Sequence, residues 1–181
     1  MITRAQQKEF RLLAADMLGK AGFPLTEKER DSIAVADFGL SNVRQQGAQI
    51  LTLFETERIS AKLIVLLPAQ ILPEHWHPPV GDDPGKEEIL RGYWGRTHYF
   101  EQGEGEIDPS LIPEDKMHCF TASKRIDLLP ADQIIIAPGT KHWMQGGPEG
   151  GIVISFSTCV RDILDQFTDP AIVRTTVVID T

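Results

Sequence analysis

Short apolar segments separated by turn residues make up the chain from Ala48 to its end. The segments lie at residues 49–55, 60–68, 133–138, 151–158 and 171–179. Glycine, proline and aspartate cluster between them, as at 81–85 and 146–151, and these residues supply the backbone conformations of tight turns. Short strands joined by tight turns favour an antiparallel sandwich or jelly roll.

The first part of the chain has a helical pattern instead. Within residues 3–21, apolar side chains recur at three- and four-residue steps, at Phe10, Leu13, Met17 and Ala21. Thr3 and Gln6 have the spacing of a capping box, and Gly22 is a suitable stop. A second, shorter helix is expected to start at 26–29.

These two regions together predict one domain. A chain of 181 residues is long enough to bury a sizeable core. It contains no internal repeat and no linker rich in serine or glycine. We therefore expect a mainly β protein in which residues 1–47 form a helical N-terminal layer and residues 48–181 form a β-barrel.

Charge and hydropathy exclude several classes of partner. The 18 basic and 26 acidic residues give a net charge of −8, and such a surface repels the phosphates of nucleic acids. The longest apolar runs are far too short to span a bilayer, and the polar N-terminus lacks the apolar core of a signal peptide. Cys119 and Cys159 are only two and lack CxxC spacing, so neither a disulfide framework nor a thiolate zinc site is indicated. We expect a cytoplasmic protein.

Three histidines are candidate ligands for a divalent metal ion. His75 and His77 are two residues apart, and alternate residues of a strand point to the same face, so both can approach one cation. His142 follows the turn at 138–140, as expected if a distant strand meets the first one inside a barrel.

A carboxylate completes this ligand set. The segment 86–95 is predicted to be the strand that returns after the 81–85 turn, and it carries both Glu87 and Glu88. Strand alternation lets only one of the two face inward, and spacing alone does not decide which. Imidazole nitrogens with one carboxylate oxygen suit Zn, Fe, Mn or Ni and do not choose among them.

The remaining histidines and two tryptophans are assigned to other environments. His98 and His118 lie in polar, irregular surroundings and are expected at the surface. Trp94 and Trp143 are expected to pack in the core rather than to form a platform for a ligand.

Several motifs resemble the D-lyxose isomerase family of metal-dependent aldose–ketose isomerases. The segment HWHPPVGDDPGKEEILRGYWG is similar to that family's cupin signature, and PGTKHWMQGGPEGGIVISFST resembles its second motif. ADFGLSN, LTLFE and FTDPAIVR also match, so the similarity spans residues 36–174. The resemblance implies a cupin, a double-stranded β-helix or jelly roll, preceded by helices.

The resemblance also implies a site and a reaction. His75, His77, Glu88 and His142 would hold the metal, with manganese as the metal it suggests, and family members are commonly homodimers. The implied substrates are sugars: D-lyxose and D-xylulose, or a related pentose or hexose pair. Lys86, in the matching DPGK segment, is a candidate to contact a sugar oxygen.

One position departs from the family pattern. Members usually carry a glutamate before the phenylalanine of the FST segment, where it is thought to serve as acid and base, and here that position is Ser155. A serine hydroxyl cannot replace a carboxylate as a general base near neutral pH without its own activator. Asp165 is our candidate to take over the proton transfer.

Two alternatives follow from this departure. The chain would be a non-catalytic, metal-dependent sugar-binding cupin if no other group replaces the missing carboxylate. Alternatively, the metal would serve a different reaction, such as that of a dioxygenase. On the first alternative, Ser155→Glu should create or raise activity.

Overall fold

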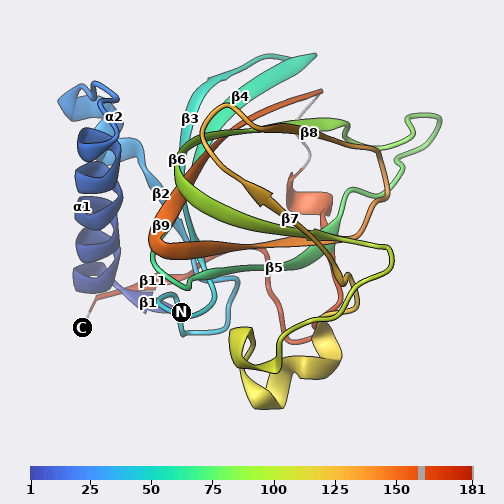
Figure 1. The fold of residues 1–181 in the computed structure, drawn as a ribbon. Coiled ribbons are helices and arrows are strands. Elements are labelled where there is room, and N and C mark those ends of the chain that lie inside the picture. The colour runs from blue at the N-terminus through green and yellow to red at the C-terminus, as the bar shows by residue number, and fades with distance from the viewer. Residues whose placement is uncertain (159–161, 181) are drawn as a thin grey trace.

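The computed structural model describes residues 1–158 and 162–180 and is mainly β, as the sequence predicts (Figure 1). Strands are β1 (Ile2–Thr3), β2 (Ala34–Ala36), β3 (Ala48–Glu55), β4 (Ile59–Leu66), β5 (Ile71–Trp76), β6 (Glu88–Glu101), β7 (Lys124–Leu128), β8 (Gln133–Ile136), β9 (His142–Thr158), β10 (Gln166–Phe167) and β11 (Val178–Ile179). Helices are α1 (Arg4–Lys20), α2 (Glu27–Ser32) and the 3₁₀ turns η1 (Pro109–Leu111), η2 (Glu114–Cys119) and η3 (Asp162–Leu164).

Two long strands organise the barrel. β6 and β9 pair antiparallel along almost their whole length, and β9 also pairs with β5 through its first half and with β4 through its second half. β3 and β2 extend the sheet beyond β4, while β7 and β8 pair with the two ends of β6. β6 and β9 each pair with different strands along their two halves. The sheet therefore curls on itself and forms the double-stranded β-helix that the sequence predicts (Figure 1).

Glycines permit the bend in this strand pair. Gly95 and Gly150 have left-handed φ values of 65° and 88°, and the pairing register shifts beside Gly95. A Cβ added to Gly95 would lie 2.4 Å from the carbonyl oxygen of Gly150, so only glycine fits there.

The helical layer covers one outer face of the barrel. Helix α1 begins with the expected capping box between Thr3 and Gln6, and Gly22 follows its end with a φ of 75°. The helix lies against β3, β4 and β9 (Figure 1). Leu51 and Leu63 are fully buried beneath it. A second cluster of apolar side chains fills the barrel interior and surrounds the candidate site described below.

The structure corrects two predictions about elements. Residues 1–47 contain the short strands β1 and β2 in addition to the helices. Of the strand predicted at 171–179, only Val178–Ile179 is extended and paired. The preceding residues contact a loop through single hydrogen bonds, such as Val173 N–H to the carbonyl of Phe38 at 2.9 Å, so they form no ladder. Within the described residues, no helix is long and apolar enough to cross a membrane.

Candidate metal centre

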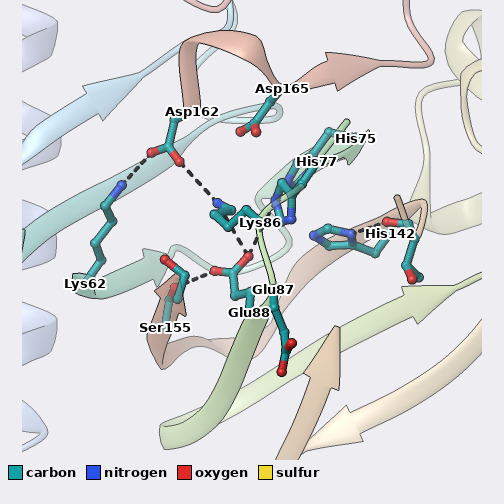
Figure 2. Close-up of polar contacts among 12 residues, drawn as sticks. Lys62, His75, His77, Lys86, Glu87, Glu88, His142, Ser155, Asp162 and Asp165 are labelled. Carbon is teal, nitrogen blue, oxygen red and sulfur yellow. Dashed lines mark hydrogen bonds and ion pairs between the residues drawn. The ribbon is translucent and has the colours of Figure 1, made fainter. Parts of the chain in front are cut away.

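Strand pairing brings the three candidate histidines together inside one end of the barrel. His75 near the end of β5 pairs directly with His142 at the start of β9. His77 lies just beyond β5. The ligand nitrogens of the three rings all lie within 4.8 Å of one another, and all three side chains are buried (Figure 2). This group could hold a metal ion.

Hydrogen bonds fix the orientation of two of the rings. Nδ1 of His75 lies 2.9 Å from the carbonyl oxygen of Pro73, and Nδ1 of His142 lies 2.8 Å from that of Thr140. A carbonyl only accepts, so each Nδ1 carries the proton and each Nε2 presents a lone pair.

The third ring fits the same purpose. Both nitrogens of His77 are buried and make no hydrogen bond with any described residue, which is costly unless a ligand occupies one of them. Burial is the main cause that lowers the pKa of all three histidines, to about 2 for His77, so the imidazoles are neutral. The chemistry of the set therefore fits a divalent cation.

Glu88 is the carboxylate that faces this cluster. Its side chain is buried, and its Oε2 lies 3.5 Å from Nε2 of His77. Glu87 is exposed and points away from the histidines (Figure 2). Burial acts to raise the pKa of Glu88, but the charge of Lys86 and a hydrogen bond from Ser155 lower it overall, so the carboxylate is ionised.

Ser155 contacts this glutamate directly. It lies on β9, faces into the barrel, and its hydroxyl donates a short hydrogen bond to Oε1 of Glu88 (Figure 2). Ser155 is therefore a hydrogen-bond partner of the candidate ligand Glu88.

Lys86 and Asp165 are titratable groups that line the cavity beside Glu88. The Lys86 ammonium lies 3.6 Å from Oε2 of Glu88. Although burial acts against the charge, Glu88, Asp162 and Asp165 raise the pKa of Lys86 above its usual range. Burial raises the pKa of Asp165 to about 7; Lys86 opposes this rise and Asp162 adds to it.

The cavity is small and lies beside a groove. The enclosed part has a volume of about 50 Å³, room for one or two water molecules. A neighbouring groove of about 370 Å³ shares Ile50, Lys62, Asp162 and Arg174 with it. These shared residues form the wall between the two spaces.

Sequence reasoning missed Lys62, Asp162 and Arg174 as members of the site. The sequence could have pointed to Lys62, because a lysine inside the apolar run 60–68 is unusual. Alternation along β4 places it on the interior face together with Ile64, where both line the cavity. The grouping of Asp162 and Arg174 with it depends on tertiary structure.

The other aromatic residues behave partly as predicted. Trp143 is fully buried and stacks on Phe100, with ring centroids 3.7 Å apart. Trp94 packs partly buried against the core below α1. His118 is exposed, but the surface prediction for His98 is wrong. His98 is buried on β6, where its Nδ1 lies 2.8 Å from Asp127.

The fold identifies the class of protein. The structure is similar to an L-ribose isomerase variant of Acinetobacter sp. DL28 solved with L-ribose, with a TM-score of 0.82, 14% identity and 98% of each chain covered. It also resembles the ligand-free L-ribose isomerase of Cellulomonas parahominis, with a TM-score of 0.77, 16% identity and 94% of each chain covered. The chain is a cupin with an added helical layer.

Sequence comparison identifies the family. The chain is 45% identical to the D-lyxose ketol-isomerase of Cohnella laeviribosi, covering 94% of each chain. It is 42% identical to the D-lyxose ketol-isomerase of Thermofilum sp. (strain ex4484_79), and 39% identical to the D-lyxose/D-mannose isomerase of Thermosediminibacter oceani. Each of these two alignments covers 96% of this chain and 97% of the relative. No protein-family model matches. The chain belongs to the D-lyxose isomerase family.

Proposed function

We propose that this protein is a metal-dependent aldose–ketose isomerase that interconverts D-lyxose with D-xylulose, or a closely related sugar pair. The observation that carries the proposal is the cluster of three neutral imidazoles, of which His75 and His142 line the cavity. The ionised carboxylate of Glu88 and the buried ammonium of Lys86 line the same cavity. Membership of the D-lyxose isomerase family supports the choice of substrate.

His75, His77, Glu88 and His142 would hold the metal ion. Manganese is our first choice because of the family resemblance, and the donor set also suits Zn, Fe or Ni. When bound, a divalent cation supplies Lewis-acid polarisation of the sugar carbonyl and stabilises the negative charge that develops on neighbouring sugar oxygens.

Asp165 is our candidate for the acid and base. Aldose–ketose isomerisation moves one proton from C2 to C1 and a second from the oxygen at C2 to the oxygen at C1. One carboxyl group that can both accept and donate is sufficient for the carbon-bound proton. Asp165 lines the cavity and has a pKa of about 7, close to the value that favours proton transfer in both directions near neutral pH.

Lys86 would contact a sugar oxygen. Its ammonium is buried in the cavity beside Glu88, and it stays charged. A fixed cation at this place favours the transition state because charge develops on the oxygens at C1 and C2 as the carbonyl moves.

Family membership and surface charge also support proposals about the state of the protein. We propose that it works in the cytoplasm as a homodimer. Its net charge of −8 argues against nucleic-acid partners. Light scattering of the purified protein would test the dimer.

Turnover by the metal-loaded protein tests the proposed function. We expect protein loaded with Mn²⁺ to convert D-lyxose or D-mannose to the ketose, and chelation to stop the reaction. Glu88→Gln should lose metal and activity, whereas the adjacent Glu87→Gln is the matched control and should retain both. Product is measured by chromatography and metal by elemental analysis.

The outcome separates the proposal from its alternative. Metal-loaded protein that turns over none of a panel of pentoses and hexoses would reject catalysis. Saturable sugar binding in calorimetry without product would instead support a sugar-binding cupin. Absence of any sugar affinity would reject both.

A further inference from the structure

Asp162 lies between two buried lysines. Its Oδ2 is 2.5 Å from the Lys62 ammonium, and its Oδ1 is 3.1 Å from the Lys86 ammonium (Figure 2). Both lysine side chains are only 11% exposed, so these contacts are poorly screened by solvent. The carboxylate of Asp162 therefore fixes the positions of both lysine ammonium groups.

The buried lysine on β4 is costly without such a partner. Lys62 pairs across the sheet with Ser155 and enters the barrel interior beside Ile64. A buried ammonium must find a counter-charge. Asp162 supplies that counter-charge, and Lys86 and Lys62 in turn lower the pKa of Asp162 well below its usual range against the effect of burial.

Arg174 fixes the other side of this aspartate. Its Nε donates to the backbone carbonyl of Asp162 at 3.0 Å, and one terminal nitrogen lies 3.5 Å from Oδ2. The same guanidinium lies 4.0 Å from Asp165. The backbone and the side chain of Asp162 are both restrained by cations.

Two carboxylates compete for the Lys86 ammonium. Asp162 lies at 3.1 Å and Glu88 at 3.6 Å. If Asp162 were neutral, the flexible lysine would pair with Glu88 alone and compete with any cation for that oxygen. With Asp162 charged, Lys86 is held at the wall of the cavity.

We propose that Asp162 and Lys62 are positioning residues for the isomerisation, acting together to hold Lys86 in place. This inference rests on the proposed function of Lys86. Lys62 keeps Asp162 ionised and oriented, Asp162 directs Lys86, and Lys86 contacts the sugar. The pair lies in the wall shared by the cavity and the groove.

Three variants test this arrangement by steady-state kinetics. Asp162→Asn should lower kcat about 10- to 100-fold, because a misplaced contact group costs that much, while metal content stays unchanged. Lys62→Met should lower kcat in the same direction, and Lys62→Arg should restore part of the loss. Lys116→Met is the matched control: it breaks a 2.7 Å ion pair to Asp169 away from the cavity and should leave kcat unchanged.

NMR of the lysine ammonium groups tests the positioning role without measuring enzyme activity, so its result does not depend on the proposed function. In metal-free protein, lysine Cε–Nζ correlation NMR should show slowly exchanging ammonium signals for Lys62 and Lys86, because both are buried and ion-paired. Asp162→Asn should remove or shift both signals, and Lys116→Met should not.

Each outcome has a definite meaning. If Asp162→Asn leaves the Lys86 signal unchanged, or leaves kcat within twofold of the parent, the positioning role is wrong. If the parent protein shows no turnover but the NMR result is as expected, the ion-pair arrangement stands and the proposed function fails. A loss of kcat in Lys116→Met equal to that of Lys62→Met would also overturn the inference.

Discussion

At the scale of single residues, Asp165 has the property expected of an acid and base. Its pKa is raised from 3.8 to about 7, chiefly by burial, whereas Asp162 three residues earlier remains ionised. The difference arises because Asp162 contacts two lysines at 2.5 and 3.1 Å, whereas the guanidinium of Arg174 lies 4.0 Å from Asp165. Two aspartates in one cavity thus have different protonation states.

Asp165→Asn should reduce kcat about 10²- to 10⁴-fold without loss of metal. Because a base must be deprotonated, the parent's rate should rise with pH to a plateau, with its midpoint at or below about 7, since a bound cation lowers the pKa. A variant with a rate close to that of the parent would exclude Asp165 as the base.

Asp165→Asn should also change how the stability of the metal-free protein depends on pH. A raised carboxyl pKa means that the folded state binds the proton more tightly than the unfolded state does, so this group makes the parent lose stability as pH rises from about 4 to about 7. Denaturation midpoints should therefore fall less in Asp165→Asn than in the parent over that range.

Ser155 has a structural role that its residue type alone does not indicate. Because its hydroxyl holds Oε1 of Glu88, Ser155→Ala should weaken metal affinity about 10- to 100-fold. Ser155→Glu would place a second carboxylate against Glu88, and we expect it to lower activity. Metal titration and initial rates provide the measurement. A rise in activity in Ser155→Glu would instead support the view that the serine marks a lost base.

At the scale of elements, the bend shared by β6 and β9 makes the site possible. The bend lets β6 carry Glu88 at one end and pair with the His142 end of β9 at the other. Gly95 permits it, because its φ is 65° and no side chain fits against Gly150.

Gly95→Ala should destabilise the fold by at least about 2–3 kcal/mol, from its left-handed conformation together with the clash. Gly22→Ala is the matched control: it has a similar φ of 75° but open space around it, so it should cost only about 1 kcal/mol. Urea denaturation compares the two. Equal losses would show that the contact with Gly150 is unimportant.

At the scale of the whole molecule, the helical layer and the site occupy different parts of the barrel. Helix α1 covers the outer faces of β3, β4 and β9 (Figure 1). The candidate ligands are buried inside the barrel. The structure thus separates the packing that stabilises the barrel from the cavity where polar groups are buried.

Some local features of this molecule could be predicted from the sequence because they depend only on neighbouring residues. The capping box at Thr3, the stop at Gly22 and the paired imidazoles of His75 and His77 each depend on residues close together in the chain. Neighbouring side chains and backbone preference determine such features. The short apolar segments and turn residues from Ala48 onward also predicted the class of fold.

Tertiary structure decided the rest, because register and strand order depend on contacts between distant residues. The register of β6 turns Glu88 inward and Glu87 outward, a choice that residue spacing alone leaves open. The pairing of β5 with β9 brings His142 to His75. The meeting of Lys62 with Asp162 joins residues 100 positions apart, so sequence alone determined which chemical groups are present, and the fold determined which of them meet.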